Sequence, residues 1–328
     1  MSQKVRWGIL STANIGRKLV IPAIQRANNT EVVAMASRGE QVYEAAKELQ
    51  IPKTYTSYEE LLLDPEIDAV YIPLPNHLHK EWVLKAAASK KHILVEKPAG
   101  LTAAEVKEMQ KACADNGVII MEAFMYRFHQ QHEAVQKWID EGKIGDVQMM
   151  RASFSFQMRD PENNIRMKPE FGGGAMYDVG CYTINSFRYF LGEPTSVVAE
   201  AVFNENGVDL TAHGILQFSS NVKGVFDTSF TMSGRNEYEI IGTEGRIHVP
   251  YAYRPDAYPE GGSIHLYTDE GQETQQIDHD QYRAQAEHIS KCILDGTTPI
   301  YSLENTYLNM KVIDAVYESM RKGVRVTI

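Results

Sequence analysis

Apolar, strand-like segments alternate with helix-like segments through the first 123 residues of this 328-residue chain. The predicted strands are 5–10, 32–37, 68–73, 92–96 and 118–123, and the predicted helices between them are 16–27, 40–49, 79–89 and 102–116. Parallel strands need crossover helices of this kind, whereas antiparallel strands can be joined by short turns. The alternation therefore predicts an α/β domain with a doubly wound parallel sheet.

The boundaries of one helix carry specific signals. Thr102 is the predicted N-cap, and Glu105 completes a capping box three residues later. Gly117 is expected to end this helix, because glycine adopts the left-handed conformation common at helix C-termini.

After about residue 124 the pattern changes to long alternating segments that lack crossover helices. The predicted strands are 147–158, 196–203, 208–218, 222–232, 237–243 and 245–249, and the predicted helices are 130–140, 175–191, 281–294 and 303–322. This predicts an α+β domain with an open, predominantly antiparallel sheet. We expect two domains, 1–123 and 124–328.

Composition excludes several classes of protein. A chain with 43% hydrophobic residues can bury more than one core, and its net charge of −10 argues against a nucleic-acid partner. Cys113, Cys181 and Cys292 are scattered without disulfide or metal spacing and are predicted to be small buried side chains. With neither a signal-peptide pattern nor a long apolar run, we expect a cytoplasmic protein without a membrane partner.

The turn after the first strand, GILSTANIG, is a candidate pyrophosphate-binding turn. The three glycines of the G-x-G-x-x-G pattern would fall at Ser11, Ala13 and Gly16, so only one glycine is present. Small side chains there let the backbone approach a pyrophosphate at the helix N-terminus, with Asn14 and Ile15 in the same turn. The alternative is an ordinary strand-turn-helix. The position of the GILSTANIG turn at the first strand-to-helix crossover favours a dinucleotide-binding Rossmann domain.

Ser37 and Arg38 stand where NAD-specific enzymes carry an acid that binds the adenosine ribose. A guanidinium and a hydroxyl can bind a 2′-phosphate, and no carboxylate repels it. The pair favours NADP, with NAD still possible. The alternative is a solvated surface arginine.

Two further segments carry the expected chemistry. Glu96-Lys97-Pro98 follows a buried strand, at the edge where open parallel sheets bind ligands, and Gly172-Gly173-Gly174 forms a flexible lead into a helix that carries Asp178 and Tyr182 four residues apart. Hydride transfer at an alcohol needs a group that exchanges the hydroxyl proton. A tyrosine can do so when an ammonium, here Lys97, lowers its pKa. The alternatives are a surface lysine and a core tyrosine.

At these segments the chain resembles the Gfo/Idh/MocA family, named for glucose-fructose oxidoreductase and inositol dehydrogenase. WGILSTANIG, ASR, PLPNHLH, VEKP, EAFMYRFH and GGGAMYDVGCY occur in the family's order and spacing. The chain is most similar to the NADP-using branch with dihydrodiol and D-xylose dehydrogenases. Many inositol dehydrogenases carry histidine where this chain has Tyr182, which makes inositol a less expected substrate.

The resemblance implies a set of cofactor-binding residues and an oligomer. Lys97 and the residue at the position of Tyr182 would flank the reacting carbon, and subunits would pair through the exposed face of the second sheet as a homodimer or a dimer of dimers. Besides the residues of the first turn and of Ser37-Arg38, the expected cofactor-binding residues are Pro73, Leu74, Asn76, His79, Glu96, Lys97 and Arg127.

We therefore expect an NADP(H)-dependent oxidoreductase that acts on a sugar, polyol or trans-diol. Tyr182 would exchange the proton, Lys97 would stabilise the developing alkoxide, and Asp178 would orient the substrate or Lys97. Two alternatives stay open: a non-catalytic NAD(P)-binding regulator of the same fold, and a reductase of unsaturated or imine-like substrates. No metal is expected, since the histidine pairs 77/79 and 129/132 lack acidic or cysteine partners and are interpreted as cofactor-side and cleft-wall residues.

Overall fold

The computed structural model describes residues 3–219 and 221–328, which form two compact units. The first unit runs to Phe128 and also contains Asp280–Tyr307, and the second contains His129–His279 and Leu308–Ile328. The chain thus returns to the first unit after the second sheet, through helix α8 (Gln281–Asp295). The indole N–H of Trp7 donates to Ser290 Oγ of this helix at 3.2 Å. This return differs from the expected single domain at 124–328, because an amphipathic helix does not show which sheet it will cover.

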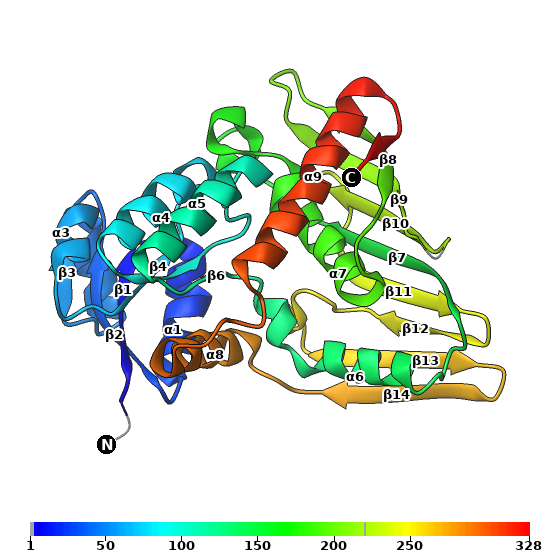
Figure 1. The fold of residues 1–328 in the computed structure, drawn as a ribbon, viewed down its shortest axis with the longest axis horizontal. Helices are drawn as coiled ribbons and strands as arrows, with labels where there is room; N and C mark the ends of the chain where they lie inside the picture. The colour runs from blue at the N-terminus through cyan, green and yellow to red at the C-terminus, as the bar shows by residue number, and fades with distance from the viewer. Residues whose placement is uncertain (1–2, 220) are drawn as a thin grey trace. The chain divides into compact units, whose positions relative to one another are not determined.

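The first unit contains a six-stranded sheet in the order β3-β2-β1-β4-β5-β6, and every pair that is hydrogen-bonded is parallel (Figure 1). The strands are β1 (Val5–Leu10), β2 (Thr30–Ala36), β3 (Lys53–Tyr55), β4 (Ala69–Ile72), β5 (His92–Val95) and β6 (Ile120–Glu122). This confirms the predicted parallel sheet. Strand β3 was not predicted, because three half-buried residues contain no apolar run. The order reverses between β1 and β4, which is where such sheets bind nucleotides.

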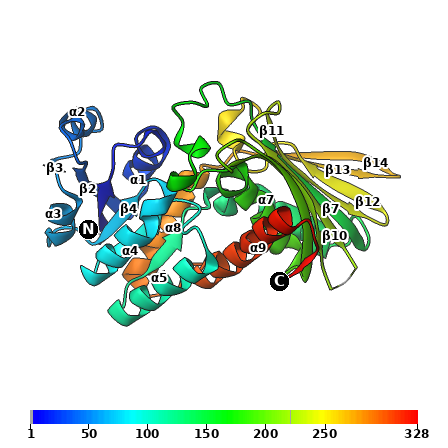
Figure 2. The same cartoon turned by 90° about the horizontal axis from the view of Figure 1, so that it is seen from above.

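Helices cover both faces of this sheet, as predicted. The first unit's remaining elements are η1 (Gly16–Val20), α1 (Ile21–Arg26), α2 (Gln41–Glu48), α3 (Tyr58–Leu63), η2 (Asn76–Leu78), α4 (His79–Ala88), α5 (Ala103–Asn116) and η3 (Met125–Phe128). Figure 2 shows α1 and α2 on one side and α3, α4 and α5 on the other. Right-handed crossovers place them so, because the strand order runs first one way and then the other.

The predicted ends of α5 are largely confirmed. Thr102 Oγ1 accepts the backbone N–H of Glu105 at 3.2 Å, and Gly117 ends the helix with φ +66°. The return contact of the capping box differs from the expectation, since Glu105 Oε2 accepts the N–H of Leu101 at 2.8 Å.

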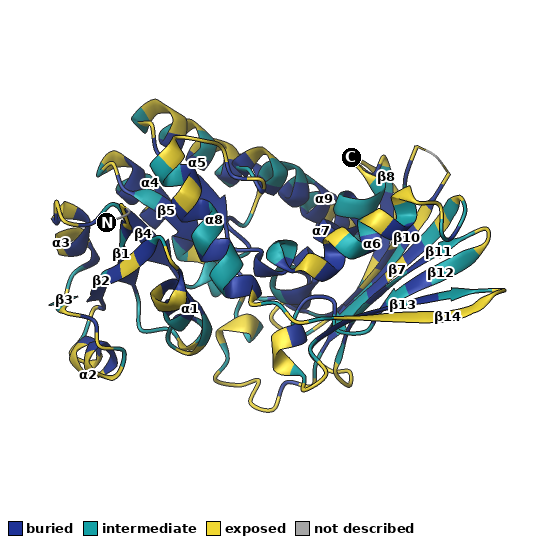
Figure 3. Ribbon diagram, turned by 90° about the horizontal axis from the view of Figure 1, so that it is seen from below, coloured by how far each residue is buried: buried dark blue, intermediate teal, exposed yellow. Residues whose placement is uncertain are grey.

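The second unit contains a nine-stranded sheet in the order β14-β13-β12-β11-β7-β10-β9-β8-β15 (Figure 1). Its strands are β7 (Val147–Ser155), β8 (Ser196–Phe203), β9 (Asp209–Gln217), β10 (Lys223–Ser229), β11 (Arg235–Gly242), β12 (Gly245–Val249), β13 (Gly262–Thr268), β14 (Gly271–Ile277) and β15 (Val326–Thr327). Among the described strands of this sheet, only β10 and β7 pair in parallel, so the predicted predominantly antiparallel character is confirmed. Strands β13, β14 and β15 were missed. Figure 3 shows β14 exposed along its length, which explains why it carries no apolar signal.

Helices cover one face of this sheet. They are α6 (Gln130–Asp140), the π-helical turn η6 (Met176–Gly180), α7 (Cys181–Leu191) and the main part of α9 (Leu303–Lys322). Short 3₁₀ turns complete the unit at η4 (Ile165–Met167), η5 (Pro169–Phe171) and η7 (Pro255–Ala257). Figure 2 shows the sheet nearly edge-on, with α7 and α9 on one side. Alternate strand residues such as Ala152, Phe226 and Tyr238 are buried beneath these helices.

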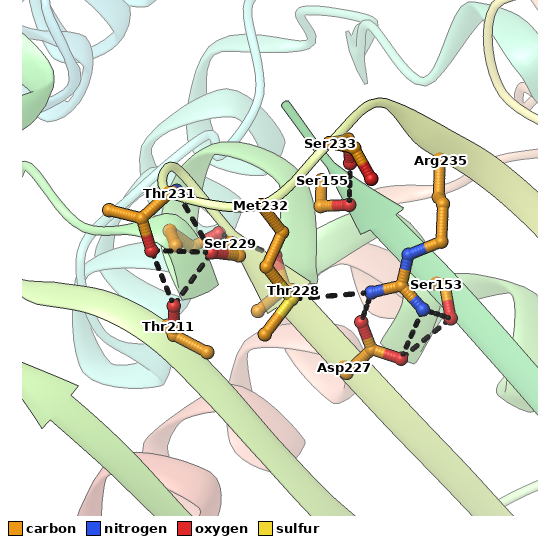
Figure 4. A network of polar contacts seen from close by, with 11 residues as sticks. Ser153, Ser155, Thr211, Asp227, Thr228, Ser229, Thr231, Met232, Ser233 and Arg235 are labelled. Atoms are coloured by element: carbon orange, nitrogen blue, oxygen red, sulfur yellow. Dashed lines mark hydrogen bonds and ion pairs between the residues drawn. The ribbon is translucent and has the colours of Figure 1, made fainter. Parts of the chain in front are cut away.

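The opposite face of the second sheet has no covering helix within the described part of its own unit. This face carries polar as well as apolar side chains. Arg235 pairs with Asp227, Ser153 also bonds Asp227, and Thr211, Ser229 and Thr231 share hydroxyl hydrogen bonds (Figure 4). Ile215 and Val202 are exposed among these polar groups, so the face mixes ion pairs with apolar patches.

The three cysteines are buried, as predicted, and none of them forms a disulfide with another described residue. Across the described ranges, no helix combines the length and the apolar character that crossing a membrane requires.

Candidate functional site

The turn after β1 has the backbone shape that the missing glycine would supply. Ser11 has φ +143°, a conformation that L-residues rarely adopt. Its Oγ accepts the N–H of Ala13 at 3.0 Å, which partly offsets the strain. Asn14 and Ile15 follow, and η1 then begins at Gly16 as a π-helical turn, a feature frequent at functional sites. The degraded fingerprint thus keeps the glycine-type turn at its first position.

Ser37 and Arg38 directly follow β2 but differ in exposure. Ser37 is buried, and its Oγ accepts a hydrogen bond from Gln41 Nε2 at 2.8 Å. Arg38 is exposed, and its guanidinium lies beside the Tyr58 hydroxyl, where it opposes the burial that raises the pKa of Tyr58. Of the two residues, Arg38 is therefore the one available to bind a ligand, while Ser37 fixes the end of the strand.

His79 joins two loops of the sheet edge. It is fully buried, with Nδ1 2.8 Å from the Pro98 carbonyl oxygen and Nε2 2.7 Å from the Leu74 carbonyl oxygen. Burial lowers the pKa of His79 to about 4, against the effect of the two carbonyl oxygens, which favour a protonated ring. With both nitrogens against the chain, His79 braces the loops after β4 and β5. It was expected to bind the cofactor, but this ring offers a ligand no nitrogen.

The Glu96-Lys97-Pro98 segment leaves the carboxyl end of β5, as predicted. Tyr71 on β4 donates its hydroxyl to Glu96 Oε1 at 2.6 Å, and Lys97 N–H donates to Glu96 Oε2 at 3.3 Å. The Lys97–Pro98 peptide is cis. Glu96 thus holds the backbone of Lys97, while the half-buried lysine side chain stands at the edge of the sheet.

Glu122 is a buried acid at the same edge that sequence reasoning missed. It ends β6, and its Oε1 accepts the N–H of Ala99 at 2.8 Å, just after Lys97-Pro98. Burial raises the pKa of Glu122 to about 7, against the effect of the Ala99 N–H and the nearby charge of Lys97. An acid in the otherwise apolar run VIIMEA was the available signal.

The other expected cofactor residues also follow strands of this sheet. Pro73 and Leu74 are buried directly after β4, and Asn76 is half-buried at the start of η2. Arg127 lies in η3, with its guanidinium carbon 5.5 Å from the centre of the Tyr301 ring. The carboxyl ends of β1, β2, β4, β5 and β6 therefore bring all the predicted cofactor residues to one edge.

Asp178 and Tyr182 lie in the second unit, on the helix formed by η6 and α7. Tyr182 is 4% exposed, and its ring centre is 5.4 Å from that of Phe154 and 5.5 Å from that of Tyr253. One side of the Tyr182 ring therefore packs against aromatic rings. This packing is what the alternative of a core tyrosine predicts. The side chain of Asp178, at 15% exposure, is more accessible.

Arg166 is a second residue that sequence reasoning missed. It lies in η4, on the loop that precedes the glycines, and its Nε donates to Asp178 Oδ2 at 2.6 Å. The charge of Asp178, and more weakly the phenol of Tyr182, raise the pKa of Arg166. Nothing in the local sequence indicated that an arginine twelve residues away would meet Asp178.

The triple glycine is required by close packing, which differs from the expected flexible lead. A Cβ on Gly173 would lie 2.4 Å from the Arg166 carbonyl oxygen. At Gly174, where φ is +129°, it would lie 2.2 Å from Asp209 Oδ1. Asp209 Oδ2 accepts the N–H of Met176 at 2.7 Å, so this buried carboxylate holds the first turn of the helix.

The histidine pairs are placed differently from the expectation. His129 and His132 are buried in the second unit, where His129 Nδ1 caps α6 by accepting the N–H of Gln131 at 3.2 Å and His132 Nδ1 lies 2.8 Å from the Tyr238 hydroxyl. They are core residues and do not line a cleft. Within residues 3–219 and 221–328, no group of three or more His, Cys, Asp or Glu side chains is arranged to hold a metal ion.

The predicted residues divide between the two units. Arg38 and Lys97 belong to the parallel sheet, whereas Asp178 and Tyr182 belong to the helix of the second unit. The edge of the parallel sheet has the form of a dinucleotide site and carries the ammonium of Lys97. The helix of the second unit carries a phenol and a carboxylate of the kinds that take part in proton transfer.

Comparisons with known proteins cover nearly the whole chain. Residues 5–124 match an oxidoreductase family with an NAD-binding Rossmann fold, and residues 132–248 match the GFO/IDH/MocA C-terminal domain. The chain is 40% identical over 324 residues to D-xylose 1-dehydrogenase (NADP(+)) 2 of Haloferax volcanii, covering 98% of both chains. It is 32% identical over 329 residues to a trans-1,2-dihydrobenzene-1,2-diol dehydrogenase of Xenopus laevis, covering 96% of this chain and 98% of the relative.

A solved structure extends this similarity to the fold. A 3-ketoreductase from Actinomadura kijaniata, in complex with NADP and TDP-benzene, superposes with a TM-score of 0.91 at 28% identity. The match covers 97% of this chain and 98% of the reductase.

Proposed function

This chain belongs to the GFO/IDH/MocA family of oxidoreductases, and on that premise we propose that it transfers hydride between NADP(H) and a carbon-oxygen centre of a sugar, polyol or trans-diol. The observation that carries the proposal is the 40% identity, over 98% of both chains, to an NADP-dependent D-xylose dehydrogenase. The dihydrodiol dehydrogenase and the 3-ketoreductase share the feature that a hydroxyl or keto carbon reacts, which supports the same reaction class here.

The residues at the sheet edge fit a dinucleotide with a 2′-phosphate. The glycine-like turn at Ser11 leaves room for backbone to approach a pyrophosphate, and the helix that follows offers its N-terminal N–H groups. Arg38 is exposed at the end of β2 and would bind the 2′-phosphate. Pro73, Leu74, Asn76 and Glu96 would line the rest of the cofactor site, with Arg127 toward the nicotinamide.

The chain supplies the groups that move and stabilise the proton. When bound, the nicotinamide accepts or supplies the hydride. Tyr182 takes the hydroxyl proton during oxidation and returns it during reduction, and Lys97 donates a hydrogen bond to the same substrate oxygen, stabilising its negative charge. Phe154 and Tyr253 hold the Tyr182 ring and exclude water from that side.

The experiment that tests this function begins with the cofactor. Fluorescence titration should show NADPH binding at least about tenfold tighter than NADH, because one charge-assisted pair contributes roughly 1.5–3 kcal/mol. A panel of aldoses, polyols and trans-diols should then give NADP-linked turnover. Tight NADPH binding with no turnover across the panel would favour the non-catalytic regulator, and turnover restricted to enones or imines would favour the reductase alternative.

The domain roles, the assembly and the location are part of the same proposal. The unit with the parallel sheet binds the nucleotide, and the unit with the second sheet binds substrate and pairs subunits through the open face of that sheet, giving a homodimer or a dimer of dimers. Exposed Ile215 and Val202 on that face support pairing, since water-exposed apolar patches favour association. Three cysteines outside disulfide bonds are compatible with a reducing cytoplasm.

A further inference from the structure

We propose that Arg166 selects the substrate, with its guanidinium donating to two neighbouring hydroxyl oxygens of a neutral vicinal diol while Asp178 holds it in place. The inference rests on the proposed function and deepens it, because it names the residue that would recognise the adjacent hydroxyls of a sugar, polyol or trans-diol. It assigns a binding role to a residue in the loop between β7 and η6.

The side chain of Arg166 is only partly used by the protein. Nε donates to Asp178 Oδ2 at 2.6 Å, and this is the one side-chain hydrogen bond that Arg166 makes with residues 3–219 and 221–328. A guanidinium has five N–H donors, so the four on Nη1 and Nη2 remain available. With 43% of its side chain exposed, Arg166 can present them to a ligand.

The backbone of Arg166 is held firmly enough to aim the side chain. Its N–H donates to Asn164 Oδ1 at 3.1 Å, and its carbonyl oxygen accepts the N–H of Gly174 at 2.9 Å. Gly173 packs so tightly on the same carbonyl that a Cβ would not fit. Both ends of the side chain, the backbone and Nε, are therefore fixed to the segment that carries Asp178.

Arg166 is also close to the proposed proton donor. Asp178 and Tyr182 both act electrostatically on its guanidinium, and both belong to the same helix. A substrate oxygen that bonds the Tyr182 hydroxyl would leave its neighbouring hydroxyls within the reach of a long, fork-shaped side chain.

The charge balance favours a neutral ligand. Asp178 compensates the charge of Arg166, so an anionic group brought to the guanidinium would also meet the carboxylate. Hydroxyl oxygens accept hydrogen bonds without that repulsion, and two adjacent hydroxyls match the spacing of two Nη donors. A sugar or a trans-diol meets this condition, whereas a simple alcohol offers one oxygen.

The opposing interpretation is that Arg166 has a structural role alone and anchors the loop between β7 and η6 to the helix through Asp178. The two roles differ in one measurable property, which is the coupling between the side chain and a substrate hydroxyl. A site that hydrogen-bonds a substrate hydroxyl discriminates against the deoxy analogue, whereas loss of a structural contact weakens the binding of substrate and analogue equally.

The test measures kcat/KM for D-xylose and 2-deoxy-D-xylose in the wild type, in Arg166→Met and in Arg166→Lys. Isothermal titration of both sugars with the NADPH complex gives the same comparison without turnover. The wild type should prefer D-xylose by about 10- to 100-fold, since a hydrogen bond to a charged group contributes roughly 1.5–3 kcal/mol. In Arg166→Met the preference for D-xylose should fall below about threefold. The preference of Arg166→Lys should be intermediate, because one ammonium replaces the two Nη donor groups of the guanidinium.

Two controls separate this result from a folding defect. Arg159→Met removes an exposed arginine from the same loop and should keep the wild-type preference. NADPH affinity should stay within about twofold in every variant. A wild-type preference retained in Arg166→Met, in turnover and in titration alike, overturns the inference. Failure of the proposed function has a different signature, in which the wild type binds D-xylose with the expected preference but does not oxidise it.

Discussion

The hydroxyl of Tyr317 donates to Asp209 Oδ1 at 2.9 Å, while Asp209 Oδ2 accepts the N–H of Met176 at 2.7 Å. Asp209 is 1% exposed, so burial raises its pKa to about 6 despite these bonds. The pair stands at the start of the helix that carries Asp178 and Tyr182. Tyr177 packs on Tyr317 with ring centres 4.7 Å apart, and the guanidinium carbon of Arg321 lies 5.5 Å from the centre of the Tyr317 ring.

Replacing Asp209 with Asn should remove a pH dependence of stability. The folded pKa of about 6 exceeds the usual 3.8, so ionisation of Asp209 costs stability as the pH rises from about 4 through about 6. The full cost is about 3 kcal/mol at 1.4 kcal/mol per pKa unit. The amide of Asn can accept a hydrogen bond from the Met176 N–H and donate one to the Tyr317 hydroxyl. The free energy of unfolding of Asp209→Asn should therefore rise relative to that of the wild type as the pH increases. Urea unfolding at pH 4.5, 5.5, 6.5 and 7.5 measures the difference, and a constant difference would contradict the prediction.

Replacing Lys97 with Met should remove nearly all turnover and largely spare NADPH binding. The ammonium stabilises charge that develops during the reaction, an effect of about 100- to 1,000-fold in kcat for comparable donors. Tyr182→Phe should lose kcat through the missing proton donor, typically about 100- to 10,000-fold. Stopped-flow turnover and NADPH titration separate the two quantities. Unchanged turnover in Lys97→Met would rule out the assignment.

Replacing Arg38 with Ala should weaken NADPH binding by about 10- to 100-fold, because a charge-assisted contact to the 2′-phosphate is lost. NADH lacks that phosphate, so its affinity serves as the internal control and should change by less than about twofold. Titration of both cofactors at low and high salt checks the effect. An equal loss for NADH would point to disruption of the strand end.

Ser11→Gly and Ser11→Ala should differ in stability in a way that reports the strained turn. Both variants lose the hydroxyl that accepts the Ala13 N–H, but only glycine adopts a φ of +143° without steric strain. Ser11→Gly should therefore be more stable than Ser11→Ala by about 1–2 kcal/mol. Chemical denaturation of the two variants measures this difference directly. Equal stabilities would show that the turn relaxes without strain.

The open face of the second sheet should pair subunits. Light scattering should give a mass at least twice that of the 37.0 kDa chain, and Ile215→Arg should reduce it by placing a charge on that face. Ile300→Arg is the matched control, since Ile300 is exposed but lies in the first unit. A 37 kDa wild-type species would contradict the predicted dimer.

Local sequence was sufficient where periodicity and turn chemistry act alone. The alternation of strands and helices determined the parallel sheet, and the caps of α5 followed from Thr102 and Gly117. The segment after Ala36 identified Arg38 as the exposed cation at the end of β2 in the same way. These features depend on residues that are close in the chain, so the sequence alone contains them.

Tertiary structure decided the features that join distant segments. Strand β14 carries no apolar pattern because it is exposed, and only its pairing with β13 makes it a strand. Asp209 meets Met176 and Tyr317 through burial that no local window encodes, and Arg166 reaches Asp178 because the loop folds onto tightly packed glycines. His79 was expected to bind the cofactor, but its ring is fully buried and both of its nitrogens lie against backbone carbonyl oxygens. Its contacts thus depend on two loops that are brought together only by the fold.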